Sequence, residues 1–62
     1  MDIREEMVKY RARENISMRE MAARCNVSLQ TIYSIENGMQ DPSRVTREKI
    51  RLVLDAEGEK ND

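Results

Sequence analysis

The segment SMREMAARCNVSLQTIYSIENG, residues 17–38, decides the fold of this 62-residue chain. At about 100° per residue, its first half places four apolar or small side chains on one helix face: Met18, Met21, Ala22 and Cys25. Its second half carries Ile32 and Ile35 three residues apart, which is the spacing of a second amphipathic helix. The segment therefore predicts two short helices that pack against each other through these faces.

A tight turn at Asn26-Val27 joins the two predicted helices. After Gly, Asn is the residue that best tolerates a positive φ, so Asn26 suits this connection. Ser28 is the predicted N-cap of the second helix, and Ala22 lies where the two helices must approach closely. Because the connection is so short, the second helix is presented outward, as in proteins that insert this helix into the DNA major groove.

Helix start and stop signals flank this segment. Two capping boxes mark predicted helix starts: Asp2 with Glu5, and Ser17 with Glu20. Asn15 is the predicted left-handed residue that ends the first helix, and Thr46 is the predicted cap of the last helix, with Val45 and Ile50 as a hydrophobic staple. These signals predict an all-α fold of four to five short helices, near residues 3–14, 18–25, 29–36 and 47–56.

The core expected from this pattern is small. Outside the central segment its predicted members are Ile3, Met7, Tyr10, Ile16, Ile50, Val53 and Leu54, with Val8 as a further candidate. Cys25 is interpreted as a small core residue, because a single cysteine cannot form an intramolecular disulfide. Chains this short bury only about 60% of their unfolded surface, so association with a second copy would help to stabilise the fold.

The net charge of −1 divides unevenly along the chain. Residues 55–62 carry −3, whereas residues 1–54 carry +2, which indicates a weakly basic domain followed by an acidic end. We expect one helix-turn-helix domain over residues 1–56 and a short, frayed acidic tail over residues 57–62. No apolar run is long enough to span a membrane and no signal peptide opens the chain, so the expected location is the cytoplasm.

The residue inventory argues against catalysis and cofactor binding. The chain has no histidine and one cysteine, so a structural zinc site lacks its usual ligands. No nucleophile beside a base, phosphate-cradling Gly loop or pair of carboxylates in a cleft is recognisable. We therefore expect neither enzymatic activity nor a metal or other cofactor.

The motifs together resemble the Xre/Cro helix-turn-helix family, which includes the lambdoid phage repressors. Members usually carry Leu-Ala in the first helix of the motif, Gly-Val at the turn, an Ile-x-x-Ile-Glu-x-Gly ending and a Pro shortly afterwards. The matching positions here are Met21-Ala22, Asn26-Val27, Ile32-Tyr33-Ser34-Ile35-Glu36-Asn37-Gly38 and Pro42. The resemblance covers roughly residues 3–54 and implies a lambda-repressor-like DNA-binding domain. It also implies an architectural ion pair between Arg11 and Glu36.

Helix geometry and the resemblance together indicate how the domain would contact DNA. The outward face of the recognition helix is predicted to hold the base-reading residues Leu29, Gln30, Tyr33 and Ser34. Phosphate contacts are predicted at Met18, Arg19, Ser28, Asn37, Gly38 and Arg44, from helix N-termini and the loop after the recognition helix. Two features depart from the family pattern: Met18 stands where many members have Gln, and the recognition helix has no Lys or Arg.

These expectations converge on a small sequence-specific DNA-binding transcriptional regulator, a repressor of a bacterium, phage or mobile element. It would act as a homodimer on a palindromic double-stranded operator, with Leu52 and Ala56 as candidates for the dimer contact. The alternative is a helix-turn-helix module that binds another protein, as an anti-repressor would. An antitoxin-like autoregulator combines both roles, although the toxin-binding segment that such proteins usually append is not recognisable here.

Overall fold

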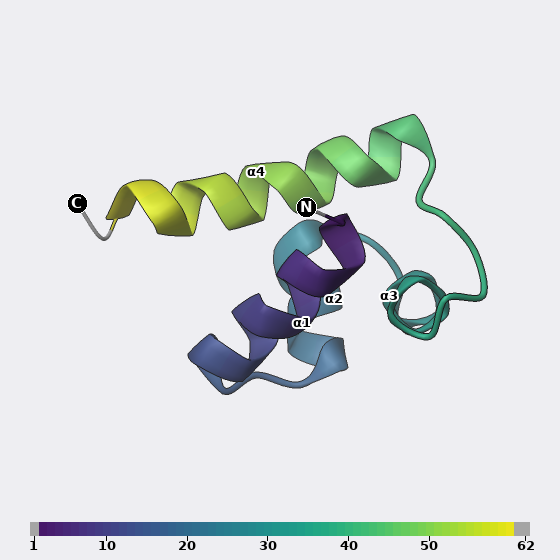
Figure 1. The fold of residues 1–62 in the computed structure, drawn as a ribbon, viewed down its shortest axis with the longest axis horizontal. Helices are drawn as coiled ribbons and strands as arrows, with labels where there is room; N and C mark the ends of the chain where they lie inside the picture. The colour runs from purple at the N-terminus through teal and green to yellow at the C-terminus, as the bar shows by residue number, and fades with distance from the viewer. Residues whose placement is uncertain (1, 61–62) are drawn as a thin grey trace.

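The computed structural model describes residues 2–60, with side chains described for residues 2–56. Four helices form the fold: α1 (Ile3–Glu14), α2 (Met18–Cys25), α3 (Leu29–Glu36) and α4 (Arg44–Lys60). Helix α2 packs on α3, α1 packs on both α3 and α4, and α2 also contacts α4. Figure 1 shows α4 lying across the other helices, with its C-terminal end projecting beyond them. The prediction of an all-α fold is confirmed.

Local capping bonds explain where the first three helices begin and end. The side chains of Asp2, Ser17 and Ser28 accept hydrogen bonds from backbone N–H groups two or three residues later, at 3.3, 3.1 and 3.1 Å. Asn15 and Asn26 follow α1 and α2 in the left-handed conformation, with φ of 57° and 58°. The three predicted N-caps and the two predicted left-handed Asn residues are therefore confirmed.

The start of α4 differs from the prediction. Ser43 Oγ accepts a hydrogen bond from the Thr46 N–H at 3.2 Å, so Ser43 is the capping residue and α4 begins three residues earlier than expected. Thr46 lies within the first turn, where its Oγ1 accepts from Ser43 Oγ at 3.0 Å. Val45 is 62% exposed, so the predicted staple between Val45 and Ile50 is wrong.

The end of α4 also differs from the prediction. The backbone of residues 57–60 continues this helix four residues beyond the expected end near Ala56. The predicted boundary between a domain over residues 1–56 and a tail over residues 57–62 thus falls inside α4, and residues 61–62 lie outside the described residues. Among the described residues, no helix combines the length and the apolar character needed to cross a membrane.

All four helices contribute side chains to one core. Its buried members are Ile3, Met7, Tyr10, Met21, Ala22, Cys25, Ile32, Ile35 and Ile50. Partly buried apolar side chains complete it: Ile16, Met18, Val27, Val53 and Leu54. Val8 is 43% exposed, so its inclusion among the core candidates is wrong. Burial raises the pKa of the Cys25 thiol, which suits its interpretation as a packing residue.

An ion pair that the sequence analysis did not anticipate fastens α4 to α1. Both terminal nitrogens of Arg51 donate to the Glu6 carboxylate, at 2.8 and 2.9 Å. The same guanidinium lies 3.6 Å from the Asp55 carboxylate, one turn along α4. The hydrogen bonds from Arg51 lower the pKa of Glu6 below its usual value of 4.5.

Candidate nucleic-acid interface

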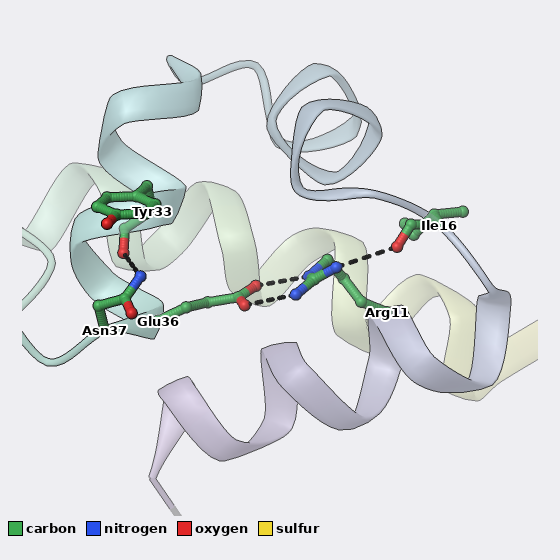
Figure 2. A network of polar contacts seen from close by, with 5 residues as sticks. All are labelled: Arg11, Ile16, Tyr33, Glu36 and Asn37. Carbon is green, nitrogen blue, oxygen red and sulfur yellow. Dashed lines mark hydrogen bonds and ion pairs between the residues drawn. The ribbon is translucent and has the colours of Figure 1, made fainter.

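The last residue of α3 is fixed by a partly buried ion pair. Arg11 on α1 donates through Nε and Nη2 to the two carboxylate oxygens of Glu36, and both distances are 2.7 Å. Arg11 also donates to the Ile16 carbonyl at 3.1 Å, as Figure 2 shows. The Glu36 side chain is only 4% exposed and the Arg11 side chain 22%. This pair, which the resemblance implied, joins α1, the α1–α2 connection and the end of α3.

A second set of contacts turns the chain away after α3. The Asn37 side chain donates through Nδ2 to the Tyr33 carbonyl at 2.8 Å, one turn back (Figure 2). Gly38 follows with a φ of +71°, a conformation that disfavours residues with a Cβ. The Met39 N–H then donates to the Ser34 carbonyl at 2.8 Å. These bonds satisfy carbonyl groups at the end of α3 and set the direction of the loop that leads to α4.

Three of the four predicted base-reading residues form an exposed surface on α3. Leu29 and Tyr33 lie one helical turn apart and are 39% and 48% exposed, and Gln30 beside them is also exposed. The opposite face of α3 is buried through Ile32 and Ile35. Helix α3 is thus anchored on one side and presents a mixed apolar and amide surface on the other.

Ser34, the fourth predicted base-reading residue, does not lie on the exposed face of α3. It is only 5% exposed, and its Oγ accepts a hydrogen bond from Gln30 Nε2 at 3.3 Å. Helical spacing alone directs residue 34 toward the same side as residue 30, but a side chain this short is covered by its neighbours. Placing Ser34 among the exposed residues of α3 was therefore wrong, and the predicted residues that α3 does expose are Leu29, Gln30 and Tyr33.

The residues predicted to contact phosphate fall into two kinds. Arg19 in the first turn of α2 and Arg44 at the start of α4 are exposed cations; the Arg44 side chain is 93% exposed and lies 4.0 Å from Glu48. The other four provide backbone or neutral polar groups: Met18, Ser28, Asn37 and Gly38. Of these, the Met18 side chain packs against the core, so the predicted contact could involve only its backbone at the start of α2.

Two further cations, which the sequence analysis did not identify, lie near the end of α3. Arg4 on α1 and Arg47 on α4 line a depression together with residues of the loop that follows α3, and the carboxylates Asp2 and Asp41 line it as well. Arg47 lies one turn after Arg44 on α4, so helical spacing was a usable signal for it. Arg4 is brought there only by the packing of α1, which the sequence does not reveal.

These features define an all-helical domain in which a short helix, packed at a tight turn against its predecessor, is exposed on its outer side. The family model described as "Helix-turn-helix" matches residues 8–56. The chain therefore belongs to this family, the Xre or lambda-repressor-like helix-turn-helix proteins. It is a family of DNA-binding regulators and is not typically enzymatic. No curated protein and no solved structure matches the chain.

Proposed function

We propose that this protein is a sequence-specific repressor of a bacterium, phage or mobile element, acting in the cytoplasm. Helix α3 would enter the major groove of double-stranded DNA, which is wide enough to admit an α-helix. The observation that carries this proposal is the exposed surface of Leu29, Gln30 and Tyr33 on a helix whose end is fixed by the Arg11–Glu36 pair. Fixed placement suits base recognition, because the contacting groups must be held within about 0.5 Å of their productive positions.

Each exposed residue of α3 suits a different contact. The amide of Gln30 has the donor and the acceptor that adenine N7 and N6 require for a bidentate pair. Leu29 provides apolar surface for a thymine methyl group, and Tyr33 carries a hydroxyl that suits a base edge or a phosphate. Arg19 and Arg44, together with the N-terminal backbone of α2 and α3, would hold the flanking phosphates.

We propose that the repressor is a homodimer on a palindromic operator. Leu52 is 72% exposed on α4, and Ala56 lies exposed one turn further along the same helix. Pairing through these residues would cover apolar surface and join two recognition helices for half-sites about 34–36 Å apart. Leu52→Glu should shift sedimentation toward monomer, whereas Val8→Glu on α1 is the matched control and should not. A wild-type chain that stays monomeric at high micromolar concentration, with and without DNA, would contradict the dimer.

Selection from a random duplex library, followed by binding measurements on the enriched site, tests the proposal. Gln30→Ala should cost about 1–3 kcal/mol on that site and relax selectivity at one base pair. Arg19→Ala and Arg44→Ala should instead weaken binding to all sequences alike, each reducing the salt slope by about one unit. Lys9→Ala removes the same charge from the exposed side of α1 and serves as the control. Absence of duplex binding by the wild type at low salt would refute the proposal.

A protein-binding role is the alternative that this experiment separates. The observation in its favour is exposed apolar surface near α3, since Leu29, Tyr33 and Met39 are 39%, 48% and 65% exposed and α3 carries no Lys or Arg. A module of this kind, such as an anti-repressor, would show no duplex binding at low salt. Its affinity for another regulator would instead depend on these three side chains.

A further inference from the structure

The side chain of Gln30 is held by a second residue of α3. Its Nε2 donates a hydrogen bond to Ser34 Oγ, one helical turn along, at 3.3 Å. Gln30 is exposed whereas Ser34 is 5% exposed, so one partner lies at the surface and the other beneath it. A ligand approaching α3 from outside therefore meets the Gln30 amide in an orientation that Ser34 has already set.

This hydrogen bond changes which groups Gln30 can offer. A free Gln amide has two N–H donors and one carbonyl acceptor. The bond to Ser34 occupies one donor, which leaves one donor and one acceptor. In the major groove adenine presents one acceptor, N7, and one donor, the N6 amino group, whereas guanine presents two acceptors, N7 and O6. The remaining groups of Gln30 match adenine and mismatch guanine.

We propose that Ser34 is a positioning residue that restricts Gln30 to adenine without itself touching DNA. This inference rests on the proposed function and adds to it the base class that one residue of α3 selects. Ser34 also holds the amide in place before binding, so less side-chain freedom is lost when the base is contacted. A change confined to Ser34 should therefore alter selectivity at the base pair that Gln30 contacts.

The test uses the full chain and the duplex enriched by the wild type from a random library. The base pair contacted by Gln30 is identified as the position where Gln30→Ala loses selectivity. Affinities are then compared for A·T and G·C at that position. The variants are Ser34→Ala and Ser34→Cys, which remove or weaken the acceptor while keeping a small side chain, and each is combined with Gln30→Ala.

The expected wild-type preference for A·T over G·C at this position is about fivefold or more. In Ser34→Ala and Ser34→Cys it should fall about fivefold, the equivalent of one ordinary net hydrogen bond. In the Gln30→Ala background the same Ser34 changes should have no effect on selectivity, because their action passes through Gln30. Thermal unfolding without DNA shows that each variant is folded.

Two results overturn the inference and leave the proposed function intact. One is an unchanged A·T preference in both Ser34 variants, although Gln30→Ala loses it. The other is an equal loss of affinity for every duplex, which indicates that Ser34 only supports the fold of α3. Failure of the wild type to bind any duplex would overturn the proposed function first and this inference with it.

Discussion

Replacing Arg11 should destabilise the domain more than replacing any exposed cation. The Glu36 side chain is 4% exposed, and its carboxylate receives two hydrogen bonds of 2.7 Å from Arg11. Arg11→Met leaves this carboxylate buried without its partner and removes the donor to the Ile16 carbonyl. Breaking a buried ion pair in this way costs about 3–5 kcal/mol. A domain of this size has a total stability of only about 3–9 kcal/mol, so this cost is a large share of the free energy of unfolding.

Urea denaturation followed by far-ultraviolet circular dichroism measures this cost. The midpoint should fall while the slope, which reports the surface exposed on unfolding, stays unchanged. Arg44→Met is the matched control: its side chain is 93% exposed and 4.0 Å from Glu48, so its cost should be about 0.5 kcal/mol or less. The double variant Arg11→Met with Glu36→Met should recover most of the stability, because no unpaired charge then remains buried.

A cost below about 1 kcal/mol for Arg11→Met would refute this reasoning, since it would mean that solvent reaches Glu36 when Arg11 is removed. A double variant no more stable than Arg11→Met would also refute it. In that case the loss would come from the methionine side chain at position 11 rather than from the uncompensated carboxylate.

Three further variants test other parts of the fold. Ala22 is 4% exposed where α2 and α3 cross, so Ala22→Leu should lower the free energy of unfolding by about 1–3 kcal/mol through overpacking, measured as a lower urea midpoint. Asn26→Ala should cost about 1 kcal/mol because φ is 58° there, and Asn26→Gly should cost less in the same assay. The pKa of Glu6 is lower in the folded than in the unfolded state, so the wild type should be more stable than Glu6→Gln. This difference in the free energy of unfolding should be largest at pH values above the unfolded-state pKa near 4.5. It should shrink as the pH falls through the lower folded value, in denaturation curves recorded across that range.

The first three helices could be predicted because their boundaries depend on local contacts. The capping bonds of Asp2, Ser17 and Ser28 reach only two or three residues along the chain, so a short stretch of sequence contains both partners. The start of α4 is also set by a local contact, but it was predicted wrongly because two residues could accept the first bond. Ser43 and Thr46 are both capping residue types, and the sequence alone does not decide which one accepts the first bond.

The packing of the helices and the candidate site depend more on contacts between distant residues, and prediction was correspondingly weaker. The Glu6–Arg51 pair joins residues 45 apart in the chain, and no local pattern marks it. The Arg11–Glu36 pair joins residues 25 apart and was expected only because the motifs resemble a known family. Ser34 was misplaced because helical spacing gives the direction of a side chain but not what covers it.

The charge distribution around α3 separates affinity from selectivity in the proposed repressor. Helix α3 has no Lys or Arg, and its one charge, Glu36, is paired with Arg11. Attraction to phosphate must therefore come from cations on other helices, such as Arg19 and Arg44, while the bases face the neutral groups of α3. Salt screens the attraction between these cations and the phosphates, but it has little effect on the contacts between the neutral side chains of α3 and the bases. Raising the salt concentration should thus weaken binding to every duplex by the same factor and leave the A·T preference attributed to Gln30 unchanged. A preference that falls together with affinity would place a cation, rather than Gln30, at the selective base pair.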